Sequence, residues 1–262
     1  MAILKHISSK NANYGDAEKY LTFEHDEFTM KPTLDADGRL IPRADYRISS
    51  LNCGGEDFAV ACMRSNLRYG KNQKREDVKS HHYIISFDPR DGPDNGLTVD
   101  KAQELGERFC REQFPSHQAI VCTHPDGHNQ SGNIHVHIVI NSLRIENVLL
   151  LPYMDRPADT KAGCKHRCTD AAMEYFKSEA MGLCHEAGLY QIDLLNGSAN
   201  RVMRIIFVPS WSKSSGYPAK PRSVDTRSGW HRLKSGWENL TVCLSAFTRI
   251  MWRGASQMKS SL

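Results

Sequence analysis

Three features that would place a protein in a membrane or outside the cell are missing from this sequence. None of its 262 residues lies in an apolar run long enough to cross a bilayer. Residues 1–6 also lack the apolar stretch of a signal peptide. The eight cysteines are scattered, which is typical of reduced thiols and not of a disulfide framework. We therefore expect a cytoplasmic protein without membrane insertion.

Tryptophan is absent from the first 201 residues, and all four copies follow them. The charge changes at the same place, from a net −4 over 1–201 to a net +8 over 202–262. We therefore expect one folded domain over 1–201 and an irregular basic tail over 202–262. Two interpretations of the tail stay open. It is either a basic arm for DNA or, as we prefer, a disordered out-of-frame translation with no selected structure.

Hydrophobic spacing and turn residues predict a chain of mixed helices and strands. Thr98 is expected to cap a helix with one apolar stripe, and Asp16 to cap a short helix. The predicted helices span 17–22, 56–68, 98–114 and 169–187, and the predicted strands span 2–7, 81–87, 118–123 and 134–140. Strands paired antiparallel, with helices against one face, describe an α+β sandwich.

The stretch Ile134–Ile140 combines β-branched residues with two histidines, a composition that favours a strand. Successive side chains of a strand point to opposite faces, so His135 and His137 project from the same face. The apolar residues that project from the other face and can pack in a core are Ile134, Val136, Ile138 and Ile140. Because two imidazoles on one face suit a divalent cation, the sequence predicts a metal site on this strand.

A third ligand is expected from the neighbouring strand. The polar segment 124–133 predicts a turn between two paired strands, which brings His124 close to His135. Asp126 is then near enough to orient one of the histidines as a hydrogen-bond acceptor. His128 lies in the same loop and is a reserve ligand, so the identity of the third ligand stays open.

Three motifs follow one another along the chain. They are Asp16–Leu21 with its tyrosine, His81–Phe87, and Thr123–Asp126 followed by His135, His137, Asn141 and Ser142. In this order they resemble the motifs of plasmid and transposon relaxases, the mobilisation nucleases of the His-hydrophobic-His endonuclease group. The resemblance covers the first 200 residues. It implies a relaxase catalytic domain in which a central antiparallel sheet, flanked by helices, carries the histidines.

The resemblance also implies an activity, the cleavage of one DNA strand at a transfer origin to start conjugative mobilisation. A side-chain nucleophile keeps the energy of the phosphodiester in a 5′-phosphotyrosyl link, so that the strand can be rejoined without ATP. Tyr20 is the expected nucleophile and Tyr14 the alternative. His124, His135 and His137 are expected to hold Mg²⁺ or Mn²⁺, although three imidazoles bind later transition metals more tightly.

Further contacts with DNA are expected around this site. Basic residues of the segment 63–79 would bind phosphates, and Tyr69 would stack on a base. Candidates for active-site or DNA contacts are His82, Ser86, Asn141, Arg64, Arg68 and Lys71. The expected partners are single-stranded or supercoiled origin DNA, an accessory mobilisation protein and a type IV secretion coupling protein.

Three other functions compete with this one. A rolling-circle replication initiator uses the same tyrosine and histidine chemistry. Only two features favour mobilisation over this alternative, namely the DNA that is nicked and the strand at 81–87. A histidine-triad nucleotide hydrolase requires a third histidine where this chain has Val139. The third alternative, from a different class, is a truncated DNA-binding remnant without catalytic activity.

Overall fold

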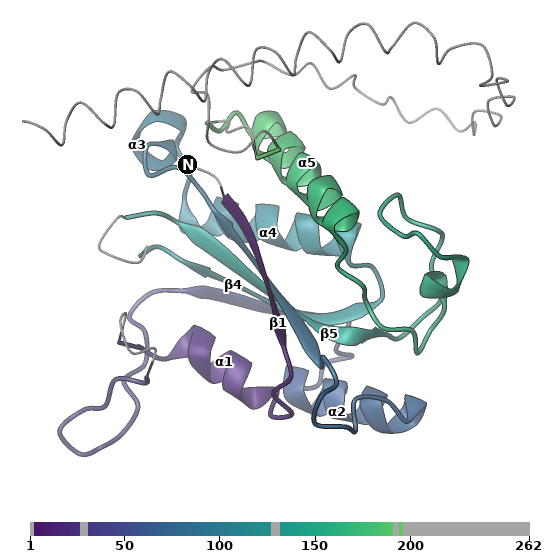
Figure 1. Ribbon diagram of the computed structural model, residues 1–262. Coiled ribbons are helices and arrows are strands. Elements are labelled where there is room, and N and C mark those ends of the chain that lie inside the picture. The colour runs from purple at the N-terminus through teal and green to yellow at the C-terminus, as the bar shows by residue number, and fades with distance from the viewer. Residues whose placement is uncertain (1–2, 27–30, 127–131, 191–193, 196–262) are drawn as a thin grey trace, which may run out of the picture. The chain divides into compact units, whose positions relative to one another are not determined.

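Five antiparallel strands form one sheet in the computed structural model, which describes residues 3–26, 31–126, 132–190 and 194–195. The strands are β1 (Ile3–Ser9), β2 (Arg47–Leu51), β3 (Ser80–Ser86), β4 (His117–His124) and β5 (His135–Arg144). Their order in the sheet is β1-β3-β5-β4-β2, which places β5 in the centre (Figure 1). The predicted α+β class is confirmed. The predicted tail over 202–262 lies outside the described residues.

Helices account for most of the remaining regular structure in the described ranges. They are α1 (Gly15–Thr22), α2 (Phe58–Tyr69), α3 (Asp91–Asn95), α4 (Val99–Gln113) and α5 (Asp170–Glu186), with a 3₁₀ turn at Pro157–Thr160. Thr98 caps α4 as predicted, because its hydroxyl accepts a hydrogen bond of 3.1 Å from the amide of Lys101. Within the described ranges, no helix is both long and apolar enough to span a membrane.

The start of α1 differs from the prediction. Asp16 is not the capping residue, because the helix already begins at Gly15. The Asp16 carboxylate instead accepts hydrogen bonds from the side-chain amides of Asn11 and Asn13, at 2.8 and 2.7 Å. These bonds tie the preceding loop to the first turn of the helix that carries Tyr20.

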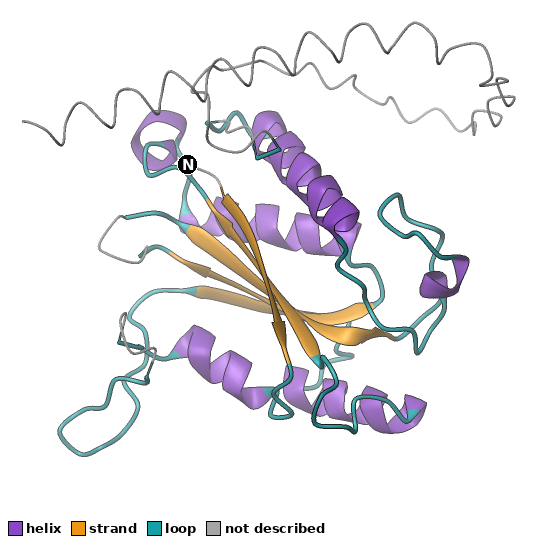
Figure 2. Cartoon of the chain, viewed as in Figure 1, coloured by secondary structure: helices purple, strands orange, loops and turns teal. Residues whose placement is uncertain are grey.

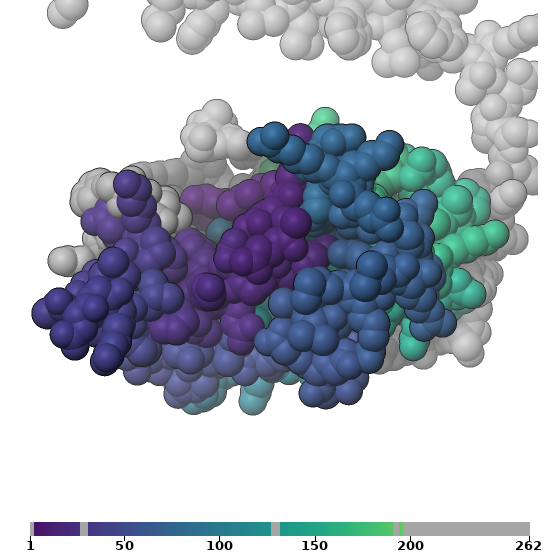
Figure 3. Space-filling model, turned by 90° about the horizontal axis from the view of Figure 1, so that it is seen from below, coloured from purple at the N-terminus to yellow at the C-terminus, as the bar shows by residue number. Residues whose placement is uncertain are grey.

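Helices cover both faces of the sheet, so the prediction of a single covered face was wrong (Figure 2). On one face α4 and α5 pack against Val121, Val136 and Ile138. On the other face α1 and α2 pack against Ile120 and Val139. Side chains on both faces of β4 and β5 are buried, so both faces of the sheet need a covering layer. Figure 3 shows this second face, where segments from the first part of the chain form the surface.

The predicted hairpin is confirmed, and its register decides where the histidines lie. β4 and β5 pair with His124 opposite His135. β3 lies on the other side of β5, with Ile84 opposite His137. Strand ends from three neighbouring strands therefore meet at one end of the sheet. The reserve ligand His128 lies outside the described residues.

Candidate metal centre and nucleophile

Three histidines meet where β4 ends and β5 begins. His124, His135 and His137 each offer one ring nitrogen, and these atoms all lie within 4.8 Å of one another. All three side chains are buried. Nitrogens that share one tetrahedral ion at about 2.1 Å are roughly 3.4 Å apart, so small rotations of the rings would close the set around an ion. No other group in the described part of the chain meets the same spacing.

Each of the three rings is held in place by a hydrogen bond. His124 Nε2 lies 2.7 Å from the carbonyl of Leu21, His135 Nδ1 lies 3.1 Å from the carbonyl of Asn133, and His137 Nδ1 lies 2.8 Å from His82 Nε2. Such bonds fix the tautomer and direction of a ligating imidazole. Because Nε2 of His124 donates to a carbonyl, its Nδ1 carries a lone pair. That buried Nδ1 has no hydrogen-bond partner among the described residues, which fits a bound cation.

Burial favours the neutral form of two of these histidines. Together with the charge of Arg43, it lowers the pKa of His124 to about 4. Burial likewise lowers the pKa of His137 well below its usual value, again helped by its histidine neighbours. Neutral imidazole is the form that binds a metal, so His124 and His137 can act as ligands at neutral pH without first losing a proton.

Tyr20 lies beside the three histidines. It projects from α1, and its ring centre lies 5.9 Å from that of His137 at an angle of 87°. The ring of His82 is 6.2 Å away at 77°. The tyrosine is partly buried, and burial raises its pKa while the charge of Arg43 lowers it. The ring of Tyr20 therefore lies beside one candidate ligand, His137, and beside its neighbour His82.

Tyr14, the alternative nucleophile, is held elsewhere. It is buried, and its hydroxyl donates to the carbonyl of Lys79 at 3.1 Å and accepts from Asn66 at 2.8 Å. Burial raises its pKa to about 12. Tyr14 lies six residues before Tyr20, about 9 Å along the helix axis. It lies among amides, and Tyr20 lies among the histidines.

The sequence around this site is similar to that of a known protein family. The model of the MobA/VirD2-like relaxase nuclease domain matches residues 43–156, which include β2 to β5 and all three clustered histidines. This segment belongs to the relaxase nuclease family. The matched segment begins after Tyr20, so the place of the tyrosine rests on the contacts described above.

Individual curated proteins are similar to this chain over parts of their length. Two proteins named Protein rlx from Staphylococcus aureus are 28% identical over 141 residues and 34% identical over 99 residues, which are 54% and 37% of this chain and 36% and 26% of theirs. Protein TraI from Escherichia coli is 24% identical over 156 residues, 58% of this chain and 18% of its own. The chain thus spans about a third, or less, of the length of these curated relatives.

Two solved structures are similar at lower identity. One, described as the molecular basis of vancomycin resistance transfer in Staphylococcus aureus, has a TM-score of 0.45 and 12% identity, and the match covers 74% of this chain and 98% of that one. The other is the conjugative relaxase TrwC in complex with oriT DNA, in a metal-bound structure. Its TM-score is 0.39 with 10% identity, covering 71% of this chain and 69% of that one.

The sequence predicted that Asp126 orients one of the three histidines, but in the structure Asp126 has a different partner. Its carboxylate pairs with Nη1 of Arg43 at 3.3 Å, and its side chain is 64% exposed. The acceptors that hold His124 and His135 are backbone carbonyls, which no sequence pattern could identify. Arg43 was also missed, because it stands alone between two turns and belongs to no motif.

His82 and Ser86 lie on the histidine face of β3, as predicted. His82 contacts His137 directly, and Ser86 pairs with His135 across the sheet. Asn141 does not reach the site. It lies six residues after His135 on β5, about 20 Å along the strand, and its side chain donates to Gln118 at 2.9 Å.

The basic segment 63–79 lies at the far end of the sheet, where it leads into β3 opposite Asn141. Arg64 pairs with Glu56, Arg68 lies over a tyrosine ring, and Lys71 is exposed. Tyr69 does not present a free ring for stacking. Its hydroxyl donates to a backbone carbonyl at 3.0 Å, and its ring packs against the backbone of another loop. These residues are therefore remote from the three histidines.

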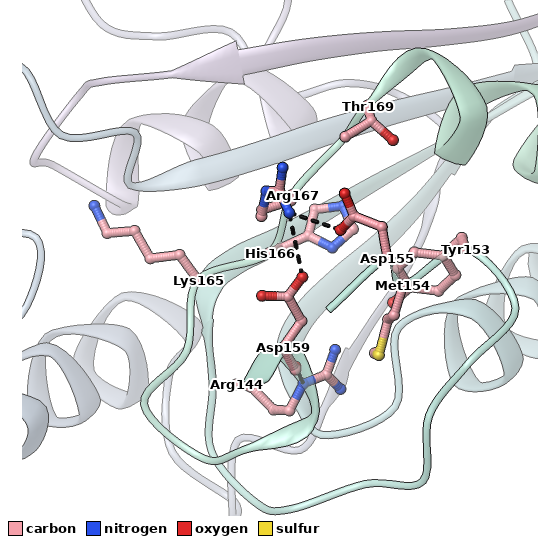
Figure 4. A pocket seen from close by; sticks show the side chains of 9 residues that line it. All are labelled: Arg144, Tyr153, Met154, Asp155, Asp159, Lys165, His166, Arg167 and Thr169. Carbon is pink, nitrogen blue, oxygen red and sulfur yellow. Dashed lines mark hydrogen bonds and ion pairs between the residues drawn. The ribbon is translucent and has the colours of Figure 1, made fainter. Parts of the chain in front are cut away.

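A second group of buried histidines lies on the opposite face, around the small pocket drawn in Figure 4. His166 lines this pocket and contacts the rings of His81 and His117, but the three do not meet the spacing of a metal cluster within the described residues. Charged residues that line the pocket already form ion pairs, as Lys165 does with Asp77 outside the pocket. Arg167, for example, forms ion pairs with Asp155 and Asp159 at 2.6 and 3.6 Å.

Proposed function

We propose that this relaxase domain nicks one DNA strand at a transfer origin by transesterification. The Tyr20 hydroxyl attacks the scissile phosphate, giving a 5′-phosphotyrosyl link and a free 3′-hydroxyl. The observation that carries the proposal is the contact of the Tyr20 ring with His137 and His82 beside the three-histidine cluster. The match to the relaxase nuclease domain, together with a tyrosine beside the histidines, supports a side-chain nucleophile in place of water.

His124, His135 and His137 would hold a divalent ion, and the unpartnered Nδ1 of His124 supports this fit. When bound, the ion would polarise the scissile phosphate as a Lewis acid. Mg²⁺ or Mn²⁺ is proposed from the resemblance to relaxases. The all-imidazole donor set would, however, bind Co²⁺ or Ni²⁺ more tightly in vitro.

The chain's own residues divide the work of the reaction. Tyr20 supplies the attacking oxygen and, as a phenolate of moderate basicity, can leave again when the strand is rejoined. Its proton must depart during the attack, because a phenol is protonated at neutral pH and burial raises the pKa of Tyr20 above its ordinary value. His82 contacts Nδ1 of His137 and would fix the orientation of that ring.

Contacts with DNA are also proposed at the end of the sheet that is remote from the three histidines. Arg64, Arg68 and Lys71 are proposed to bind backbone phosphates away from the cleavage point, where they would add affinity without touching the reacting bond. The partners proposed for the reaction are origin DNA, an accessory mobilisation protein and a type IV secretion coupling protein. All of them meet in the bacterial cytoplasm.

The test uses the full chain with single-stranded oligonucleotides of randomised sequence and Mn²⁺. A protein–DNA adduct that survives denaturing electrophoresis is expected, and EDTA should abolish it. Tyr20→Phe should form no adduct, while Tyr14→Phe should form one at the normal rate. Oligonucleotide binding without any adduct would instead indicate a DNA-binding remnant.

A further inference from the structure

Arg43 lies within electrostatic reach of the nucleophile and of two candidate ligands. Its backbone amide donates to the carbonyl of Thr22 at 2.9 Å, which joins its segment to the end of α1, two residues after Tyr20. Its positive charge lowers the pKa of Tyr20, His124 and His137. The guanidinium thus acts electrostatically on all three side chains, and its ion-pair partner Asp126 lies two residues after His124 in the chain.

Only part of the donor capacity of Arg43 is used. Its side chain is 16% exposed, and Nη1 pairs with Asp126 at 3.3 Å. The Nε atom is buried and has no hydrogen-bond partner in the described part of the chain. Buried donors of folded proteins seldom lack a partner, so an unfilled Nε beside an ion site points to a ligand that completes it.

We propose that Arg43 binds two non-bridging oxygens of the scissile phosphate, through Nε and an adjacent Nη. This assignment rests on the proposed function and names a further catalytic residue of the same site. The planar fork of arginine matches two phosphate oxygens, which a lysine ammonium cannot do. Asp126, on the exposed side, holds the guanidinium in position while leaving Nε to the substrate.

The role of Arg43 is electrostatic and involves no proton transfer. The Tyr20 oxygen forms its bond to phosphorus as the bond from phosphorus to the 3′ oxygen breaks. The phenolic proton leaves to solvent, and the 3′ oxygen takes up a proton from solvent. Negative charge grows on the non-bridging oxygens in between, and a fixed guanidinium stabilises that charge more than it stabilises the bound substrate.

The test measures the rate of adduct formation in a single turnover, with the full chain, Mn²⁺ and a saturating oligonucleotide that the wild type cleaves. Arg43→Ala is expected to be about 10²- to 10³-fold slower, the usual loss for one such donor. Affinity for the oligonucleotide should change much less, since many phosphates contribute to it. Added guanidinium ion should restore part of the rate of Arg43→Ala. The rate of Arg43→Lys should lie between those of the wild type and Arg43→Ala. Arg39→Ala is the matched control, because Arg39 is exposed and forms a similar pair with Asp37.

Asp126→Ala separates substrate binding from a structural ion pair. If Arg43 only braces the loop through Asp126, this variant will lose as much rate as Arg43→Ala and guanidinium will rescue neither, which would overturn the inference. An unimpaired Arg43→Ala would overturn it as well. If Arg43→Ala has a lower melting temperature than the wild type, Arg43→Lys is used in its place. Full activity of Arg43→Lys would contradict the proposed binding of two phosphate oxygens. If the wild type forms no adduct, the proposed function and this inference both fail. If the wild type forms an adduct, the rates of the variants test the role of Arg43 alone.

Discussion

Nε2 of His82 lies 2.8 Å from Nδ1 of His137, so two imidazoles from adjacent strands share one proton between them. The ring centres are 5.0 Å apart, and the ring of Tyr20 meets both rings edge-on. A neutral histidine can donate from only one nitrogen. The bond therefore ties the orientation of a candidate ligand to a residue that is outside the metal cluster.

The first prediction concerns His82. Replacement by Ala removes the partner of His137 Nδ1 and should weaken Mn²⁺ or Co²⁺ binding about 10- to 100-fold, the usual cost of losing such support. His82→Gln, which keeps a polar group on the strand, should lose less. Calorimetric titration of the purified chain measures both. His185→Ala, at an exposed position on α5, is the control, and an equal affinity for His82→Ala and this control would contradict the assignment.

The second prediction is that a divalent ion stabilises the fold, because the candidate ligands join β4 to β5. At a free ion concentration of 100 times the dissociation constant, binding to the folded state alone adds about 2.7 kcal/mol. The melting temperature should therefore rise with Co²⁺ and fall back with EDTA. His135→Ala should abolish the shift while His185→Ala keeps it. An ion that raises the melting temperature of His135→Ala equally is bound elsewhere.

The third prediction is an acid-sensitive stability in the absence of metal. Burial lowers the pKa of His124 and of His82 to about 4, while the unfolded chain titrates near 6.5. Below pH 6.5 the unfolded state takes up protons that the folded state does not. The free energy of unfolding should therefore fall by about 1.4 kcal/mol per pH unit for each such histidine, and level off near pH 4.

Urea unfolding in EDTA at several pH values between 4 and 7.5 measures this slope. His124→Gln should reduce the slope, because it removes one of the titrating groups. An unfolding free energy that stays constant from pH 7.5 to 5 would show that these histidines take up protons equally in the folded and unfolded states, which would contradict the lowered pKa values.

The fourth prediction concerns Gly106, where α4 crosses β5. A Cβ at this position would lie 2.3 Å from Cγ1 of Val136, the residue between His135 and His137. Gly106→Ala should therefore destabilise the fold by about 1–3 kcal/mol and displace the strand that carries two candidate ligands. Gly182→Ala on α5 is the matched control. Among the described residues, no neighbouring atom lies within 4 Å of a Cβ at position 182, so Gly182→Ala should stabilise the fold by about 0.5–1 kcal/mol. Equal effects of the two substitutions on urea midpoints would argue against the close approach.

Sequence alone predicted those features that local patterns encode. The alternation around His135 and His137 predicted a strand with both histidines on one face, and the turn-forming segment before it predicted a hairpin that brings His124 alongside. Tyr20 followed from its place in a family motif. Each of these signals lies within a few residues of the side chain that it concerns.

The features that sequence could not predict depend on contacts between distant segments. Arg43 is brought to the site by a backbone hydrogen bond to Thr22 and by an ion pair with Asp126, more than eighty residues later. Backbone carbonyls orient two of the histidines, and any residue type supplies a carbonyl. Asn141 fits the family motif, but its side chain belongs to a buried amide network.

The central claim is that Tyr20 becomes joined to DNA, and peptide mapping of the adduct tests it most directly. After nuclease digestion, trypsin cuts the chain at Lys19 and so separates the two tyrosines, leaving Tyr14 on the peptide Asn11–Lys19 and Tyr20 on Tyr20–Arg39. We predict that the nucleotide remnant is found by mass spectrometry on the second peptide, at Tyr20. A remnant on Asn11–Lys19, or on any other peptide, would contradict the account.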